Sequence, residues 1–172
     1  MDIVLASGSY DGHIRFWKVV EQKCYATIDF ETAVCSLSVS PNKQFIVAGG
    51  FNSLKVYRVD NQQLQANFRP GSDCCFSQCL FSRTGEYIFG TTEDYCLKVY
   101  DTRQLQQVYS FKNTSIVNCV EEIFLKDQDR HLIAIGDQQG RILVFDVKRL
   151  NQGPIETVRA FDRDTGVRSL SV

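Results

Sequence analysis

The chain has 172 residues, of which 44% are hydrophobic and 23% are charged, and its formal net charge is −1. Its 19 lysines and arginines are scattered, so the basic patch that nucleic-acid binding requires is missing. No stretch approaches the roughly 18–20 apolar residues of a membrane span, and Asp2 stands where a secretory signal would be basic. We therefore expect a cytoplasmic protein with no nucleic-acid partner and no membrane insertion.

Four segments of the chain resemble one another, and each combines two short apolar strands with a polar turn. An aromatic residue stands near the end of each segment, and successive aromatic residues are 40, 43 and 45 residues apart. A period of about 40–45 residues is that of a four-stranded propeller blade. The segments are 5–19, 46–59, 88–102 and 133–147, and their aromatic residues are Trp17, Tyr57, Tyr100 and Phe145.

The remaining apolar runs supply the other strands of each blade. Outer strands are predicted at 24–28, 64–68, 107–111 and 155–161, and inner strands at 34–39, 76–81, 117–125 and 167–172. The sequence thus predicts an all-β propeller over 1–172, with repeats at about 1–29, 30–68, 69–111 and 112–161 and the start of a fifth at 162–172. An inner strand that ends the chain would leave an unpaired apolar edge. We therefore expect about four blades, the N-terminal portion of a longer ring, and poor solubility for this chain alone.

Residues Leu5 to Trp17 follow the pattern Leu-Ala-Ser-Gly-Ser-x-Asp-Gly-x-Ile-x-x-Trp. This pattern resembles the WD40 repeat family, and the resemblance covers nearly the whole chain. A shortened turn at 51–53, Glu93-Asp94 before the third aromatic residue, and the run 136–140 are similar to the G-protein-β-subunit-like WD40 subunits of target-of-rapamycin kinase complexes. The resemblance implies a seven-bladed ring. It also implies a non-catalytic scaffold in growth and nutrient signalling that docks on the kinase domain and stabilises its active arrangement.

Two other classes of function stay open at this point. A WD40 adaptor in another assembly, such as a ubiquitin-ligase substrate receptor or a trafficking scaffold, would share the same repeats. A propeller enzyme would need a convergent acid–base set, and Asp11 and His13 near Ser7 or Ser9 do not make one by adjacency in sequence. We expect no catalytic residue, no cofactor and no small-molecule substrate.

Three cysteines, Cys74, Cys75 and Cys79, are close together in the sequence and raise the question of a metal site. A closed zinc site needs four ligands, and neither a second cysteine pair nor a histidine lies near them in the sequence. Buried free thiols in or beside an inner strand are the more economical interpretation. We therefore expect no metal.

The repeat positions suggest two kinds of residue with different roles. The aromatic anchors Trp17, Tyr57, Tyr100 and Phe145 are predicted to pack between blades, because large rings gain most from burial. Asp11 and Asp94 are predicted to bond backbone amides in tight turns. Partner binding is predicted on turn residues held by the rigid blades, although ordinary solvated turns would look the same. These rim positions are Tyr10, Phe51, Asn52, Glu93, Tyr95 and Gln138.

Overall fold

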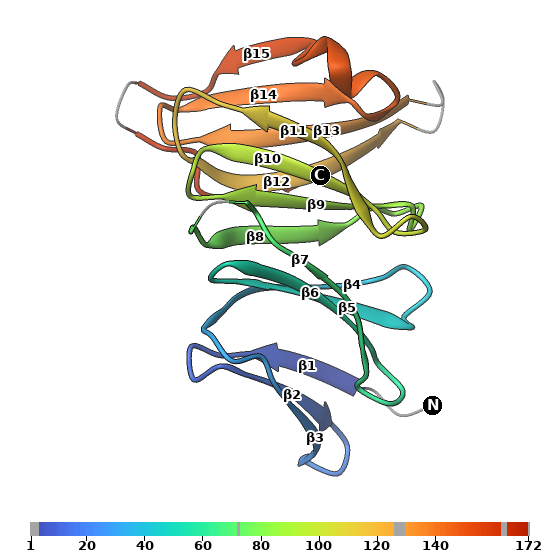
Figure 1. The fold of residues 1–172 in the computed structure, drawn as a ribbon. Helices are drawn as coiled ribbons and strands as arrows, with labels where there is room; N and C mark the ends of the chain where they lie inside the picture. The colour runs from blue at the N-terminus through green and yellow to red at the C-terminus, as the bar shows by residue number, and fades with distance from the viewer. Residues whose placement is uncertain (1–3, 72, 126–129, 163–164, 172) are drawn as a thin grey trace.

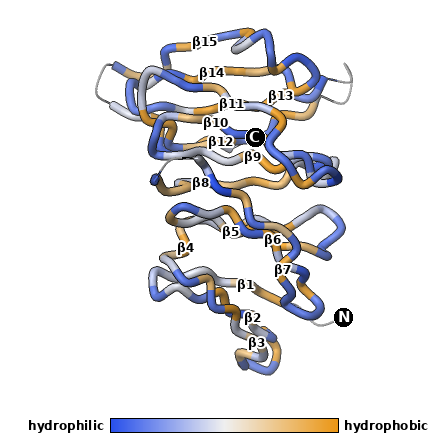
Figure 2. Tube along the Cα trace, in the orientation of Figure 1, coloured by the Kyte–Doolittle hydropathy of each residue, from blue (hydrophilic) through white to orange (hydrophobic). Residues whose placement is uncertain are grey.

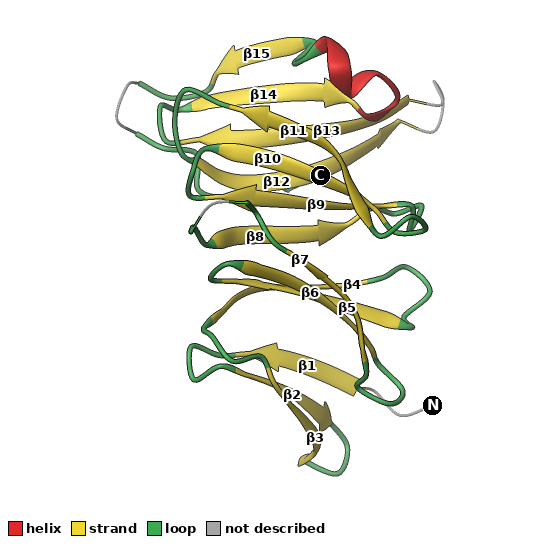
Figure 3. Ribbon diagram, in the orientation of Figure 1, coloured by secondary structure: helices red, strands yellow, loops and turns green. Residues whose placement is uncertain are grey.

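The computed structural model describes residues 4–71, 73–125, 130–162 and 165–171. Within these ranges the chain forms fifteen strands in four antiparallel sheets, which follow one another from blue to red along the chain in Figure 1. Figure 3 shows strands and turns almost throughout, with the short 3-10 helix η2 (Val147–Gln152) after the fourteenth strand. The predicted all-β class of WD40 propeller blades is confirmed.

The first two sheets, called blade 1 and blade 2, come from the N-terminal part of the chain. Blade 1 has three strands and blade 2 has four, and each strand pairs with the next one along the sequence. The strands of blade 1 are β1 (Val4–Gly8), β2 (His13–Lys18) and β3 (Lys23–Asp29), and those of blade 2 are β4 (Val34–Val39), β5 (Phe45–Gly50), β6 (Ser53–Arg58) and β7 (Leu64–Phe68).

Blades 3 and 4 repeat the four-stranded arrangement of blade 2. Blade 3 consists of β8 (Phe76–Phe81), β9 (Tyr87–Thr92), β10 (Cys96–Asp101) and β11 (Gln106–Lys112). Blade 4 consists of β12 (Val117–Leu125), β13 (Arg130–Asp137), β14 (Arg141–Asp146) and β15 (Glu156–Arg159).

The blades share their irregularities as well as their strands. The first strand of blades 2, 3 and 4 is bulged near its start, where the register shifts between Val34 and Ser36, Phe76 and Gln78, and Val117 and Cys119. The last strand pair of blades 1, 2 and 3 is bulged just before the aromatic anchor. A bulge bends a strand and increases its twist. The repeat in the sequence is therefore also a repeat in backbone geometry.

Three clusters of buried side chains hold the blades together, one at each junction between successive blades. Figure 2 shows hydrophobic residues along the strands and hydrophilic residues in the turns at their ends. Tyr57 belongs to the cluster that contains Ile14 and Phe16 of blade 1. Tyr100 stacks on Phe68 of blade 2, with ring centroids 4.5 Å apart. These aromatic anchors thus contact the preceding blade.

Phe145 continues this arrangement in blade 4, while Trp17 differs from the other anchors. Phe145 is fully buried and packs edge-on against Phe111 of blade 3, with centroids 5.0 Å apart. Trp17 lies on the side of β2 opposite Ile14 and Phe16, which face blade 2. Its side chain is only partly buried, and its indole N–H donates to Ser7 Oγ at 2.9 Å. The reason is that no described blade precedes blade 1.

The segment after blade 4 packs like the beginning of a further blade but is not assigned as a strand. Val167 is buried against Gly136, as Val34 is against Gly8. Its N–H donates to the carbonyl of Asp137 at 2.9 Å. The predicted inner strand at 167–172 is therefore wrong for the described residues 167–171, because no neighbouring strand pairs with them, and residue 172 lies outside the described ranges.

Candidate interaction surface

The turn between β1 and β2 of blade 1 and the second turn of blades 2, 3 and 4 lie at the same end of the sheets as the link to the next blade, as antiparallel order requires. Direct hydrogen bonds join the two kinds of segment: Phe30 N–H donates to the Gly12 carbonyl at 2.7 Å, and Asn113 N–H to the Tyr95 carbonyl at 2.8 Å. In blade 4, Ala160 N–H donates to the Gly140 carbonyl at 2.8 Å. We call this end the turn rim, formed by the turns 9–12, 51–52, 93–95 and 138–140 and by the described residues of the links 30–33, 69–75, 113–116 and 160–166.

Four of the six predicted partner-binding residues occupy one equivalent position on the turn rim. The strand registers pair Gly8 with Ile14, Gly49 with Leu54, Thr91 with Leu97, and Gly136 with Ile142. The residue two positions further along the chain is, in blade order, Tyr10, Phe51, Glu93 and Gln138. Tyr10 is 82% exposed and Phe51 is 51% exposed, while Gln138 is half-buried. The structure thus brings the four residues to one end of the blades.

Tyr95, also predicted at the rim, has an unusual backbone conformation. Its φ is +72°, and the equivalent residues of blades 1 and 4 are Gly12 and Gly140, with φ of +82° and +74°. A bulky residue in this region pays a steric cost that glycine avoids. Tyr95 is nevertheless 40% exposed, so part of this aromatic residue is open to a partner. An exposed aromatic ring on a strained backbone is a reason to consider a role in recognition.

Asn52 and the two turn aspartates make local contacts. Asn52 donates from Nδ2 to Asp73 Oδ1 at 2.9 Å, which ties the turn of blade 2 to the link before blade 3. Asp11 accepts from His13 N–H at 3.0 Å and pairs with Arg15 at 2.8 Å, and the Arg15 hydrogen bond holds the pKa of Asp11 well below its usual range. Asp94 accepts from the hydroxyl of Thr92 in its own turn.

The exposed charges of the turn rim are mainly acidic. Asp11, Glu31, Asp73 and Glu93 are exposed on the rim of blades 1 to 3, where Arg69 is an exposed basic residue. Glu31 is partly compensated by Lys55, whose Nζ lies 2.8 Å from its carboxylate. Together with Tyr10, Phe51 and Tyr95, these acids give the rim an aromatic and acidic character. Such a surface fits a protein partner that presents apolar side chains among basic ones.

The residues weighed for catalysis are engaged elsewhere. Ser7 Oγ accepts from Trp17, and Ser9 Oγ accepts from the N–H of Asp11 at 3.2 Å. His13 Nδ1 lies 2.9 Å from the carbonyl of Asp11. In the part of the chain that the structure describes, no three or more His, Cys, Asp or Glu side chains gather in a way that could hold a metal ion.

Several buried polar residues of the rim were not singled out from the sequence. Lys55 and Lys98 occupy equivalent positions in β6 and β10 and are 6% exposed. Lys55 Nζ donates to the Phe30 carbonyl at 3.0 Å, and Lys98 Nζ donates to the Pro70 carbonyl. Each lysine thus fastens the link that leads into its own blade. The signal in the sequence is a lysine at the same place in two repeats, inside an otherwise apolar strand.

Asp137 is the second buried group that sequence reasoning missed. It is fully buried. It accepts hydrogen bonds from Arg141 at 2.6 Å and from Asn113 Nδ2 at 3.0 Å, so it joins the turn of blade 4 to the link between blades 3 and 4. Burial would raise its pKa, but the hydrogen bonds from Arg141 and Asn113 outweigh burial and lower it. The charge of Asp137 therefore stabilises the folded chain.

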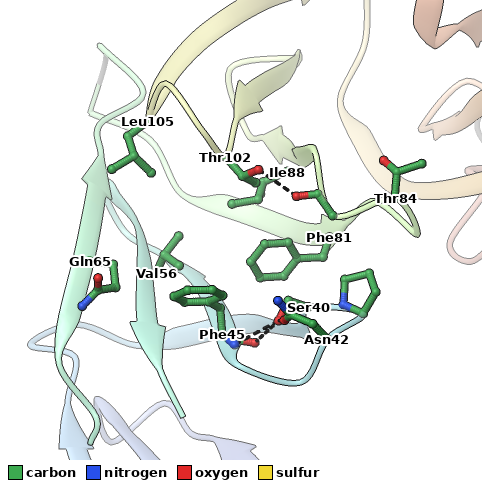
Figure 4. A pocket seen from close by; sticks show the side chains of 12 residues that line it. Ser40, Asn42, Phe45, Val56, Gln65, Phe81, Thr84, Ile88, Thr102 and Leu105 are labelled. Atoms are coloured by element: carbon green, nitrogen blue, oxygen red, sulfur yellow. Dashed lines mark hydrogen bonds between the residues drawn. The ribbon is translucent and has the colours of Figure 1, made fainter. Parts of the chain in front are cut away.

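A cavity of about 360 Å³ lies at the opposite end of the sheets, between blades 2 and 3. Figure 4 shows Phe45, Phe81 and Val56 around it, with Ser40 and Thr102 toward its edge. None of its lining residues is charged. The cavity therefore has the volume and the walls for an apolar side chain, and it lacks groups that would bind a charged substrate.

Comparison with known families agrees with the assignment of the first two blades. The model of the family described as "WD domain, G-beta repeat" matches residues 2–18 and 22–57, which cover blade 1 and most of blade 2. With the same blade repeated twice more along the chain, this protein is a WD40 repeat protein. No helix in the described ranges has the length and apolar character needed to cross a membrane.

Three curated proteins illustrate its relationships. The chain is 26% identical over 85% of its length to the target of rapamycin complex subunit LST8 of Mus musculus, and 30% identical over 69% of its length to subunit LST8-1 of Arabidopsis thaliana. It is also 24% identical over 82% of its length to the eukaryotic translation initiation factor 3 subunit I of Aspergillus oryzae. These matches cover 45%, 39% and 46% of the relatives, so the chain spans less than half the length of each.

Proposed function

We propose that this protein is a non-catalytic scaffold subunit of a target-of-rapamycin-type kinase complex in the cytoplasm. WD40 repeat proteins are typically non-catalytic and bind other proteins. The observation that carries the proposal is the similarity to target of rapamycin complex subunits, which extends over 85% of the chain in the mouse protein. In this role the propeller binds the kinase domain in its active arrangement and thereby shifts the kinase population toward that arrangement.

We assign the contact with the kinase to the turn rim. Tyr10, Phe51, Asn52, Glu93, Tyr95 and Gln138 lie on it, and the blades behind them are rigidly packed. Exposed aromatic side chains are the residues that most often dominate the energy of a protein interface. The acidic residues Asp73 and Glu93 complement basic side chains on the partner and speed its association.

The first test is the composition of the native complex. The full reading frame is tagged at its own locus, purified gently at native expression level, and its companions are identified by mass spectrometry. A phosphoinositide-kinase-like protein in near-equal amount is the expected result. A different stable partner, with reproducible absence of such a kinase, would overturn the proposal.

A pair of matched variants tests the turn rim. Tyr10→Ser, at a residue 82% exposed on the rim, should reduce kinase recovery at least tenfold, about 1.4 kcal/mol of binding energy. Val20→Ser changes a residue that is 80% exposed in the turn between β2 and β3, at the other end of blade 1, and should leave recovery unchanged. Equal recovery for both variants would place the contact elsewhere on the propeller.

The second candidate is a WD40 adaptor in another assembly. The chain is similar over 82% of its length to a translation initiation factor subunit, at an identity of 24%. This identity is close to the identity with the mouse protein, which supports the second candidate. The same purification separates the two candidates. Initiation-factor subunits in place of a kinase would establish the second.

A further inference from the structure

Two thiols from different blades touch on the inner side of the propeller. Cys35 lies at the bulge of β4, and Cys75 directly precedes β8. Their sulfur atoms are 3.3 Å apart, although the residues are 40 positions apart in the sequence. The contact joins the inner strand of blade 2 to the end of the link that leads into blade 3. Because both side chains are only partly buried, small solutes can reach them.

The other five cysteines differ from this pair in burial or in neighbours. Cys74, Cys79, Cys96 and Cys119 are buried, and Cys79 contacts the Val47 carbonyl and Ser36. Cys24 is partly buried, but its sulfur lies near the Ala26 carbonyl and the Thr27 hydroxyl, both in its own strand. All seven cysteines fall in the described ranges.

We propose that Cys35 and Cys75 are an oxidation site at which a peroxide forms a reversible disulfide between blades 2 and 3. The Cys35 thiolate attacks one oxygen of hydrogen peroxide, the O–O bond breaks, hydroxide leaves, and Cys35 becomes a sulfenic acid. The Cys75 sulfur then displaces that oxygen, an S–S bond forms, and the oxygen leaves as water with the thiol proton. In total, two thiols and one peroxide give one disulfide and two waters.

The surroundings of the pair assign the order of these steps. Burial, the hydrogen bond with Cys35 and the nearby Glu93 carboxylate raise the pKa of Cys75 to about 12. A thiol that stays protonated is a poor first nucleophile toward peroxide. Cys75 therefore acts as the resolving thiol. A disulfide requires the sulfur atoms to approach to about 2.05 Å, which is about 1.3 Å closer than they lie here.

The test uses the protein expressed from its full reading frame and purified with its thiols reduced. The protein is treated with hydrogen peroxide, its free thiols are blocked, and its intact mass is measured. The reference is a reduced sample that is unfolded before its thiols are blocked. After correction for two fewer blocking adducts, the peroxide-treated protein should be about 2 Da lighter than the reference. Trypsin without reductant should then release residues 24–43 joined to 59–83, because the bond between Arg69 and Pro70 resists cleavage. Dithiothreitol should separate the two peptides.

Fragmentation of the joined peptides places the bond without any variant, which matters because 24–43 also holds Cys24 and 59–83 also holds Cys74 and Cys79. As a second test, Cys35→Ser and Cys75→Ser should each abolish the joined species, while Cys24→Ser and Cys74→Ser should retain it. A bond through Cys24, a bond between two copies of the chain, or oxidation of Cys35 to a sulfinic acid without any disulfide would each overturn the proposal.

The disulfide should also be visible in thermal unfolding. A cross-link across 40 residues restricts the unfolded chain, so the oxidised protein should melt about 5 °C higher than the reduced protein. The shift should vanish in Cys75→Ser and after addition of dithiothreitol. An identical melting temperature for both redox forms, with the disulfide present, would contradict the inferred link between the two blades.

Discussion

Blades 1 and 4 use similar sequences in different surroundings. Phe145 of blade 4 is fully buried against blade 3, whereas Trp17 at the same place in blade 1 is only partly buried. Arg141 reaches a fully buried aspartate, Asp137, while Arg15 pairs with the exposed Asp11. A preceding blade thus decides whether the same kind of side chain contributes much to stability. The repeat itself does not decide it.

The largest expected effect compares the two aromatic anchors. Phe145→Ala should destabilise the protein by about 3–5 kcal/mol, because it removes a fully buried ring and leaves a cavity between blades 3 and 4. Trp17→Ala should cost less than half of that, since the indole remains partly exposed. Urea unfolding followed by circular dichroism measures both. Equal losses would mean that a further part of the protein covers Trp17.

The two arginine–aspartate pairs should differ next. Asp137→Ala removes the partner of Arg141 and Asn113 inside the protein and should cost about 3 kcal/mol. Asp11→Ala removes an exposed pair and should leave the free energy of unfolding unchanged within error. A loss for Asp11→Ala as large as that for Asp137→Ala would refute the contrast between the blades.

The Asp137 effect should also depend on pH. The pKa of Asp137 is lowered in the folded chain, so the unfolded chain binds its proton more tightly. Its contribution is therefore complete above the unfolded value of about 3.9 and is lost as the pH falls through the folded value. The difference in unfolding free energy between the parent and Asp137→Ala should shrink below about pH 4. A difference that stays constant in acid would contradict the assigned role of its charge.

The smallest effect concerns the rim position at which blades 1 and 4 have glycine and blade 3 has Tyr95. Tyr95→Gly should stabilise the protein by about 1 kcal/mol, because glycine adopts a positive φ without steric cost. Tyr95→Ala keeps that cost and serves as the control. If Tyr95 contacts the partner, both variants should lower partner recovery. If the Tyr95→Gly variant is no more stable than the Tyr95→Ala variant, the backbone at residue 95 is not strained.

The sequence sufficed to predict the strands because their apolar runs are local and recur with the blade period. The anchors Tyr57, Tyr100 and Phe145 stood out for the same reason. The helical turn η2 and the missing strand pairing of 167–171 did not follow, since both depend on which neighbours are present. For the candidate site, the turn positions could be chosen from the repeat. The burial of Lys55 and Asp137 could not, because links from the previous blade create it.

The sequence by itself determined the all-β class, the blade period and the order of strands, because hydrophobic alternation and turn residues act over a few positions. The tertiary structure alone decided three other features: the exposure of Trp17, the collection of Tyr10, Phe51, Glu93 and Gln138 at one end, and the contact between Cys35 and Cys75. These features join residues about 40 positions apart or depend on a neighbouring blade. Packing of one blade on the next brings them together, and no local pattern encodes that packing.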